Sequence, residues 1–366
     1  MRIAQVAPLY ESVPPKLYGG TERVVSWLTE ELVTLGHDVT LFASGDSMTT
    51  AKLVPVCKES LRLSPESVDH LAQHFVLMEK VLSYKDEFDL IHFHVDYIHY
   101  PLSRRERYMH VTTLHGRLDI PDLVPLYETY SDIPVISISD AQRDPLPHLN
   151  WQGTVHHGLP VENYKFHRNP GKYLAFLGRT SPEKGLDRAI EIAKAAGMPL
   201  KIAAKVDKAD QEYFETVIEP MLDTEEIEFV GEIGYPEKTE FLGNAAALLF
   251  PIAWPEPFGI VMIESMACGT PVIAYPFGSV PEVVADGVTG FLVSDVAAAV
   301  EAVSQLDRVE RRKVRKHFEQ HFTSDRMALD YVKIYERMVS RKKDPVTASS
   351  GVLNWMKLPS PSSSTT

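Results

Sequence analysis

The amino-acid sequence predicts an α/β protein of two domains, each built on a parallel sheet with helices packed on its faces. Three observations favour this fold. A strand–loop–helix–strand pattern occurs from 2 to 43 and again from 245 to 275. This pattern is the repeating unit of parallel α/β sheets. The chain has 366 residues, which is long enough to form two separate hydrophobic cores.

The first unit begins with an apolar strand over 2–7 and ends with a second strand over 38–43. Between them lie Gly19, Gly20 and a helix with one apolar face, formed by Val24, Val25, Leu28, Leu32 and Leu35. The two glycines let the backbone approach a ligand because they carry no Cβ atom. The run is not Gly-x-Gly-x-x-Gly, which counts against a dinucleotide-binding domain.

A strand over 88–95 carries His92 and His94 and is followed by Asp96. Alternation along a strand places these three side chains on one face, where they could hold a metal ion. The sequence contains no second cluster of such residues, so we favour a structural role. A metal-dependent hydrolase that uses His92, His94 and Asp96 is an alternative hypothesis.

The strand over 111–114 ends in His115 and Gly116. Polar side chains at the carboxyl ends of parallel strands line the crevice of an open α/β sheet. His115 is therefore a candidate for a hydrogen bond with a sugar hydroxyl or a diphosphate, although a lone histidine is more often structural. The run His-Arg-Asn-Pro-Gly after Phe166 has the composition of a linker, so we place the domain boundary near 168.

The second half opens with an apolar strand over 173–177, followed by a loop that carries Arg179 and Lys184. Two cations at the carboxyl end of a strand can neutralise a diphosphate without a metal ion. An isolated pair of this kind is more often solvated. A purely solvated role for Arg179 and Lys184 is less favoured if their loop lies beside a second motif that binds the same ligand.

That second motif is the unit over 245–275. An apolar strand, a Pro- and Gly-rich turn, a helix over 260–268 and a second strand follow one another, with Glu256 just before the helix and Glu264 about one turn inside it. The start of a helix attracts an anion, and carboxylates accept hydrogen bonds from hydroxyl groups. A sugar and a ribose joined by a diphosphate would fit this pattern. In the alternative, Glu256 caps the helix and Glu264 is a solvated surface residue.

Composition limits the classes of partner. The net charge of −13 and the pI near 5.5 argue against nucleic acid as the main partner. Cys57 and Cys268 suit a reducing compartment and offer neither a disulfide framework nor a cysteine zinc site. No apolar run approaches about 20 residues, and the first residues lack the core of a signal peptide, so we expect a cytoplasmic location. A basic helix over 306–322 is predicted to be a solvated face rather than a membrane contact, and the Ser/Pro/Thr-rich tail over 342–366 is predicted to be disordered.

Three motifs together resemble those of a known family. The run Pro-Glu-Pro-Phe-Gly-Ile…Glu-Ser-Met-Ala-Cys-Gly-Thr-Pro-Val, over 255–272, resembles the signature of the retaining glycosyltransferases of family 4, which have the GT-B fold. Gly-Arg-x-x-x-x-Lys-Gly, over 178–185, resembles the phosphate clamp of that family, and Gly-Gly-x-Glu-Arg-Val, over 19–24, resembles its glycine loop. The resemblance covers residues 1 to about 340.

The resemblance implies two Rossmann-like domains that face each other across a cleft. An acceptor-side domain over 1–167, a nucleotide-sugar-binding domain over 168–322 and a terminal helix over 323–341 that crosses back to the first domain are expected. The implied reaction is that of a hexosyltransferase: a sugar moves from a nucleotide diphosphate donor to an acceptor hydroxyl with retention of configuration. UDP is favoured because it is the commoner nucleotide in the family, and no metal or other cofactor is expected. The acceptor, whether a glycan, a lipid-linked sugar or a small molecule, is not identified.

The same resemblance implies the site residues. The catalytic residues would be His115, Arg179, Lys184 and Glu256, and the donor-binding residues would be Gly19, Gly20, Val230, Gly231, Glu232, Phe258, Gly259, Ile260 and Glu264. Two positions depart from the family pattern: His157 stands where an asparagine is expected, and Lys205 where many relatives have glycine. We assign no role to either. A catalytically inactive module that binds a nucleotide sugar is a further alternative.

Overall fold

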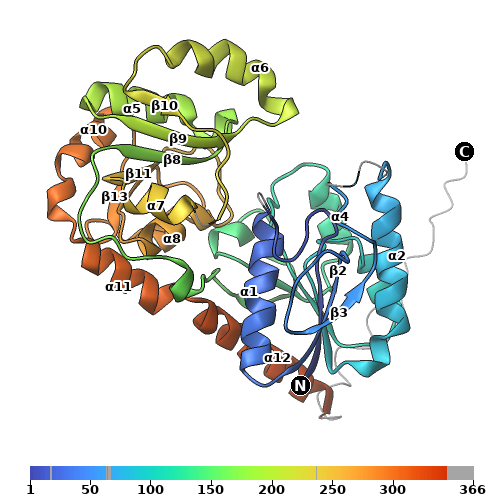
Figure 1. Cartoon of the computed structure of the whole chain (residues 1–366). Helices are drawn as coiled ribbons and strands as arrows, with labels where there is room; N and C mark the ends of the chain where they lie inside the picture. Colours follow the sequence, from blue (N-terminus) through green and yellow to red (C-terminus); the bar gives the residue numbers. More distant parts are fainter. Residues whose placement is uncertain (17–18, 63, 65–66, 236, 344–366) are drawn as a thin grey trace, which may run out of the picture.

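The computed structural model describes residues 1–16, 19–62, 64, 67–235 and 237–343. They form two α/β halves that lie side by side (Figure 1), so the predicted fold class is confirmed. The tail predicted to be disordered lies outside the described residues, apart from positions 342 and 343, which end the last helix.

The first half is built on a seven-stranded sheet with the order β3-β2-β1-β4-β5-β6-β7. Its strands are β1 (Arg2–Val6), β2 (Asp38–Ala43), β3 (Lys52–Pro55), β4 (Leu90–Phe93), β5 (His110–Thr113), β6 (Val135–Ser137) and β7 (Trp151–Thr154). Its helices are α1 (Gly20–Thr34), α2 (His70–Ser83), α3 (Tyr100–Ser103) and α4 (Leu123–Thr129). All neighbouring strands are parallel. The loops that follow β1, β4 and β5 therefore meet at one edge of the sheet.

The second half has a six-stranded parallel sheet with the order β10-β9-β8-β11-β12-β13. Its strands are β8 (Leu174–Arg179), β9 (Leu200–Lys205), β10 (Ile227–Phe229), β11 (Ala247–Phe250), β12 (Val272–Ala274) and β13 (Gly290–Leu292). Its helices are α5 (Leu186–Ala196), α6 (Gln211–Tyr213), α7 (Glu237–Gly243), α8 (Ile260–Ala267), α9 (Val280–Val283), α10 (Val296–Ser304) and α11 (Arg311–His321). Apart from Gly178 and Arg179 at the end of β8, the central strands β8 and β11 consist of apolar residues, as expected for strands with helices on both faces of the sheet.

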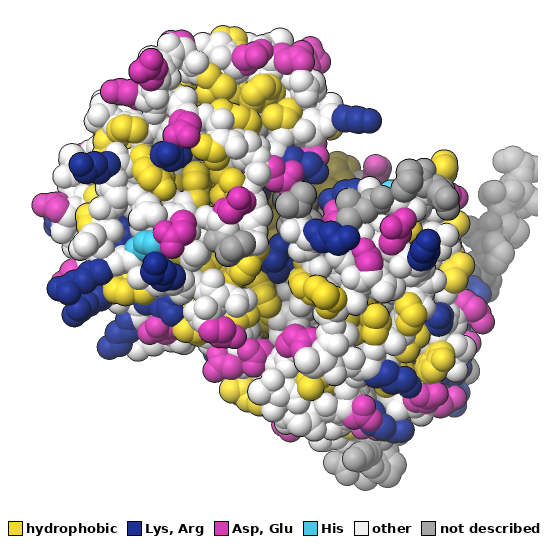
Figure 2. Space-filling model, in the orientation of Figure 1, with side chains coloured by type: hydrophobic (Ala, Val, Ile, Leu, Met, Phe, Trp, Pro, Cys, Tyr) yellow, Lys and Arg dark blue, Asp and Glu magenta, His cyan; other side chains and the backbone are white. Residues whose placement is uncertain are grey.

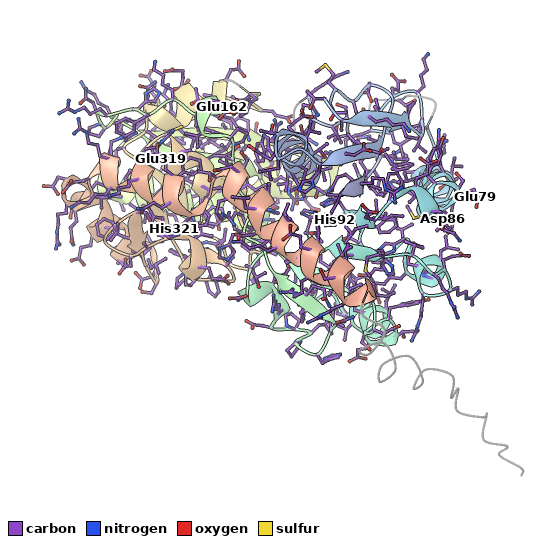
Figure 3. The ribbon with its side chains drawn as sticks, turned by 90° about the horizontal axis from the view of Figure 1, so that it is seen from below. Glu79, Asp86, His92, Glu162, Glu319 and His321 are labelled. Atoms are coloured by element: carbon purple, nitrogen blue, oxygen red, sulfur yellow. The ribbon has the colours of Figure 1, made fainter. Side chains whose placement is uncertain are left out.

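The last helix, α12 (Ser324–Lys343), connects the two halves. Figure 3 shows the chain turning from α11 into α12, which then runs beneath the first half, close to His92. The Tyr335 hydroxyl lies 2.7 Å from His92 Nδ1, and the Ser324 hydroxyl donates to Glu31 at 2.6 Å. One cluster of buried apolar side chains continues from α1 through α12 into the second half, so α12 ties the halves together by packing as well as by hydrogen bonds.

The structure over 306–322 differs in two ways from the basic helix predicted there. It is divided into a 3₁₀ turn, Leu306–Arg308, and α11. Arg311 and Arg315 also point inward: Arg311 donates to the carbonyl of Gly243 at 2.7 Å, and Arg315 donates to that of Ala267. These carbonyls end α7 and α8 and need donors, so the two arginines do not belong to an exposed basic face, and the prediction was wrong for them.

Candidate active site

A cavity of about 600 Å³ lies between the two halves, and residues of both line it. Figure 2 shows the surface hollowed between them. The predicted site residues that line this cavity are Gly19, Gly20, His115, Arg179, Lys184, Glu232, Glu256, Phe258, Gly259, Ile260 and Glu264. Val230 and Gly231, which precede Glu232, are not among its lining residues.

The start of α8 forms one wall. Gly259 precedes the helix with φ 76°, and a Cβ atom there would lie 2.8 Å from Met262 Cε, so this position requires glycine. The Ser279 hydroxyl donates to the Phe258 carbonyl at 2.9 Å, and its backbone N–H donates to the Glu256 carbonyl at 2.9 Å. The loop is therefore held in place. The partial positive charge of the helix start faces the cavity.

Lys184 stands beside Glu256 on this wall. Its Nζ atom lies 2.5 Å from Glu256 Oε2 and 4.7 Å from the centre of the Trp254 ring. Gly185 follows with φ 74°, and a Cβ atom there would lie 2.2 Å from the Pro251 carbonyl oxygen. Glycine thus lets the Lys184 loop approach the strand end that leads to Glu256. An ammonium group has three N–H donors, so Lys184 can bind Glu256 and an anion at once.

Arg179 ends β8 at the rim of the cavity. Its guanidinium lies 3.2 Å from Glu183 and 4.0 Å from both Asp207 and Asp210. Lys205, at the end of the neighbouring strand β9, lines the same cavity and pairs with Asp207 at 2.8 Å. The position that departs from the family pattern therefore adds a second cation beside Arg179.

Glu264 lies on the far side of the α8 start and is only 2% exposed. The Tyr164 hydroxyl donates to Glu264 Oε1 at 2.9 Å, and Lys238 Nζ lies 3.1 Å and 3.3 Å from the two carboxylate oxygens. A buried carboxylate needs a compensating charge and hydrogen bonds, and Tyr164 and Lys238 supply them to Glu264 at the cavity wall. Neither was predicted from the sequence, because neither lies in a run that resembles the family motifs.

His115 faces α8 from the first half. Burial lowers its pKa to about 3, so the ring is neutral at physiological pH. Its ring stacks on that of His157 with centroids 5.4 Å apart, and the His157 ring meets the Phe258 ring edge-on at 4.8 Å. His157, to which the sequence assigned no role, therefore fills the space between His115 and the α8 loop.

Four side chains that were not predicted as site residues of a transferase line the first-half end of the cavity: Tyr10, Glu22, Asp96 and Tyr97. Burial raises the pKa of Glu22 to about 7 and that of Asp96 to about 6. Asp96 has φ 49°, and among the described residues no other non-glycine residue has a positive φ. Strained backbone of this kind is concentrated at functional sites. The sequence offered one signal, since Glu22 belongs to the Gly-Gly-x-Glu-Arg-Val run.

The arrangement of His92 and His94 does not favour the hydrolase hypothesis. The ring nitrogens of His92 lie 2.7 Å from the Tyr335 hydroxyl and 2.7 Å from the Thr113 hydroxyl, and those of His94 lie 2.9 Å from His115 and 2.8 Å from Gln5. Each nitrogen thus has a protein partner. In the part of the chain that the structure describes, no group of three or more His, Cys, Asp or Glu side chains is placed to hold a metal ion.

The geometry agrees with the comparisons to known families. Residues 163–321 match the family described as Glycosyl transferases group 1, and residues 18–151 match Glycosyltransferase Family 4. The chain belongs to the family 4 glycosyltransferases. Residues of both matched segments of this glycosyltransferase line the cavity that contains Arg179, Lys184, Glu256 and Glu264.

Curated relatives of this glycosyltransferase cover it to different extents. It is 25% identical to an uncharacterized glycosyltransferase of Methanocaldococcus jannaschii over 80% of this chain and 85% of that protein. It is 31% identical to the D-inositol 3-phosphate glycosyltransferase of Mycolicibacterium smegmatis over 41% of this chain and 34% of that protein. It is 28% identical to an uncharacterized protein of Klebsiella pneumoniae over 44% of this chain and 46% of that protein, so the match spans less than half of either.

Solved structures show the same fold. Sucrose-phosphate synthase from Thermosynechococcus elongatus superposes with a TM-score of 0.78 at 18% identity, covering 93% of this chain and 99% of that one. AviGT4, a glycosyltransferase involved in avilamycin A biosynthesis, superposes with a TM-score of 0.71 at 24% identity, covering 93% and 98%. Anabaena HepE in complex with UDP and glucose superposes with a TM-score of 0.68 at 19% identity, covering 94% and 99%. The fold of this glycosyltransferase is GT-B. No helix among its described residues is both long and apolar enough to cross a bilayer.

Proposed function

We propose that this glycosyltransferase moves a sugar from a nucleotide diphosphate donor to an acceptor hydroxyl and retains the anomeric configuration. One observation carries the proposal. Lys184, Arg179 and the start of α8 line one cavity with Glu256 and Glu264. Three sources of positive charge and two carboxylates thus share one cavity, which suits a diphosphate with a hydroxylated group at each end.

The donor would lie along the second half. Its diphosphate would bind Arg179, Lys184 and the N–H groups at the start of α8. Its ribose would bind Glu264, and its sugar would bind Glu256 and, across the cavity, His115. Glu264 is held by Tyr164 and Lys238, so its oxygens are already oriented before a ribose binds, which reduces the entropy lost on binding.

The chemistry follows from this placement. The bond between the sugar and the diphosphate breaks through a transition state with oxocarbenium character, and negative charge grows on the leaving phosphate oxygen. Arg179 and Lys184 would stabilise that charge. The acceptor hydroxyl attacks from the same face and passes its proton to the leaving phosphate. The protein then needs neither a base nor a metal ion for the transfer.

UDP is the nucleotide that we propose. Anabaena HepE, which shares the fold, was solved in complexes with UDP, with UDP and glucose, and with UDP-glucose. A panel of UDP- and GDP-sugars, screened by the rise in Tm that binding produces, tests this choice. A larger rise with any GDP-sugar than with every UDP-sugar would overturn it.

For the acceptor, we propose a neutral polyhydroxylated molecule. Tyr10, Tyr97, Glu22 and Asp96 form the first-half end of the cavity, where ring faces and carboxylates suit a sugar or cyclitol. Arg62 at this end is paired with Glu11 at 2.9 Å. A phosphorylated acceptor would meet the charge of Asp96 there and be repelled. Initial rates with matched pairs of neutral and phosphorylated sugars measure the preference, and a faster phosphorylated acceptor would contradict it.

A transfer assay with radiolabelled donor sugar tests the activity itself and separates it from an inactive binding module. Label is expected in a neutral acceptor when chelator is present. Donor binding without label in any acceptor or in free sugar would favour the inactive module. Loss of all turnover with chelator, restored by a metal ion, would favour the hydrolase alternative.

A further inference from the structure

A chain of hydrogen bonds lies beneath His115. It starts at Gln5 on β1, passes through His94 just after β4, and ends at His115 just after β5, on three adjacent strands. Gln5 and His94 are 0% and 2% exposed. Because no solvent competes with these bonds, each group must find its donor or acceptor within the protein.

Gln5 determines which group donates in each of these hydrogen bonds. The Gln5 amide nitrogen donates to the Tyr335 hydroxyl, on α12, at 3.4 Å. Its amide oxygen then faces His94 Nε2 at 2.8 Å. An amide oxygen only accepts, so the proton of this bond belongs to His94 Nε2.

The position of the proton on His94 determines the position of the proton on His115. Burial lowers the pKa of both rings, that of His94 well below its usual value, so each ring carries one N–H proton. With its proton on Nε2, His94 has an unprotonated Nδ1, which lies 2.9 Å from His115 Nε2. His115 must therefore donate from Nε2, because the bond a ring nitrogen makes decides the tautomer. Its Nδ1 atom is left unprotonated.

We infer that Gln5 sets the tautomer of His115 through His94, and that His115 presents an unprotonated Nδ1 to the donor sugar as an acceptor for one of its hydroxyl groups. The inference rests on the proposed function for its ligand. Phosphate oxygens only accept hydrogen bonds at neutral pH, so an unprotonated Nδ1 cannot bind the diphosphate. This separates two roles that the sequence left open for His115. Gln5 and His94 act as positioning residues.

The tautomer can be measured without any ligand. Two-bond ¹H–¹⁵N correlation spectra of the histidine-labelled protein distinguish a protonated from an unprotonated ring nitrogen, and the signals of His115 and His94 are assigned by their loss in His115→Gln and His94→Gln. We expect Nε2 to be protonated and Nδ1 unprotonated in both rings. A proton on Nδ1 of either ring would overturn the inference, whatever the outcome of the transfer assay.

Two variants test the role of Gln5. Gln5→Met and Gln5→Glu both lose the amide N–H that reaches Tyr335, but only Gln5→Glu keeps an oxygen that can accept from His94. We expect a proton on His115 Nδ1 in Gln5→Met and on Nε2 in Gln5→Glu. An unchanged His115 tautomer in folded Gln5→Met would contradict the relay. A proton on His115 Nδ1 in both variants would also contradict the relay, because Gln5→Glu keeps the accepting oxygen.

Binding distinguishes the two ligands of His115. Calorimetry with UDP and with the UDP-sugar chosen by the panel should give unchanged affinity for UDP in Gln5→Met and roughly tenfold weaker affinity for the UDP-sugar. A merely structural role for Gln5 would weaken both equally, and that result would overturn the assignment to the sugar. If the parent protein has the predicted tautomer but binds no nucleotide sugar, the proposed function fails and the relay remains.

Discussion

Lys184 Nζ lies 2.5 Å from Glu256 Oε2, although the two residues are 72 positions apart in the chain. Their side chains are 18% and 10% exposed. The cation that we assign to the diphosphate is therefore bound to the carboxylate that we assign to the sugar before any donor is present. The diphosphate and the sugar of the donor would therefore meet one preformed ion pair, which fixes the distance between the two groups that recognise them.

Removing the cation should damage transfer most. Lys184→Ala takes away a charge that stabilises the leaving diphosphate and leaves Glu256 unpaired beside it, so we expect kcat to fall about 100- to 1000-fold. Initial rates at saturating donor measure the change. Lys194→Ala, which breaks an exposed pair with Asp223, is the matched control and should behave like the parent. Equal rates for the two variants would show that Lys184 is not part of the site.

Removing the carboxylate should separate binding from catalysis. In Glu256→Gln the ammonium group of Lys184 no longer faces a negative charge, so we expect UDP to bind as tightly as in the parent or more tightly. Transfer should nevertheless slow, because the sugar loses the group that holds its hydroxyls. Calorimetry with UDP and steady-state rates give the two quantities. Weaker binding of UDP by this variant would contradict the assignment of Glu256 to the sugar.

Glu264 should report on the ribose. Two hydroxyls bound to one carboxylate would give UDP an advantage over 2′,3′-dideoxy-UDP, and Glu264→Gln should reduce that advantage by roughly tenfold. Lys238→Met should reduce it in the same direction, because Lys238 bonds both oxygens of Glu264. Competition binding measures the ratio. A ratio that is unchanged in both variants would place the ribose elsewhere.

Glu22 should make stability depend on pH. Burial raises its pKa from 4.5 to about 7, so the folded state binds more protons than the unfolded state between these values, and stability falls as pH rises through them. The ionised side chain then destabilises the protein by about 3 kcal/mol above pH 7. Glu22→Gln should raise Tm at pH 8 and change it much less at pH 5. The exposed control Glu128→Gln should show no such difference, and a pH-independent effect of Glu22→Gln would contradict this account.

The parts of the fold that could be predicted from sequence are those set by local pattern. Apolar runs located the strands β1 and β11, and Gly259 marked the start of α8, because burial and a positive φ each select residue types directly. The helix predicted over 260–268 begins where α8 begins and extends one residue beyond its end. The glutamates and cations were found because they lie inside runs that resemble a family signature.

The contacts that support the site could not be predicted in this way. Glu282, on α9, accepts hydrogen bonds from the backbone N–H groups of Asp140 and Ala141 at 2.8 Å each and lies 2.9 Å from His156 Nε2. These partners are more than a hundred positions away, and nothing in the local sequence of Glu282 indicates them. The hydrogen bond from Tyr164 to Glu264, which are 100 positions apart, is of the same kind. Such contacts depend on how two halves of the chain pack, and hydrophobic periodicity does not specify that.

A crystal structure with a bound UDP-sugar tests the central claim most directly. We predict that the diphosphate oxygens lie within hydrogen-bond distance of Arg179 and Lys184, with the ribose on Glu264 and the sugar between Glu256 and His115. A donor bound outside this cavity, or one whose diphosphate reaches the protein only through a divalent cation while both basic side chains point to solvent, would contradict it.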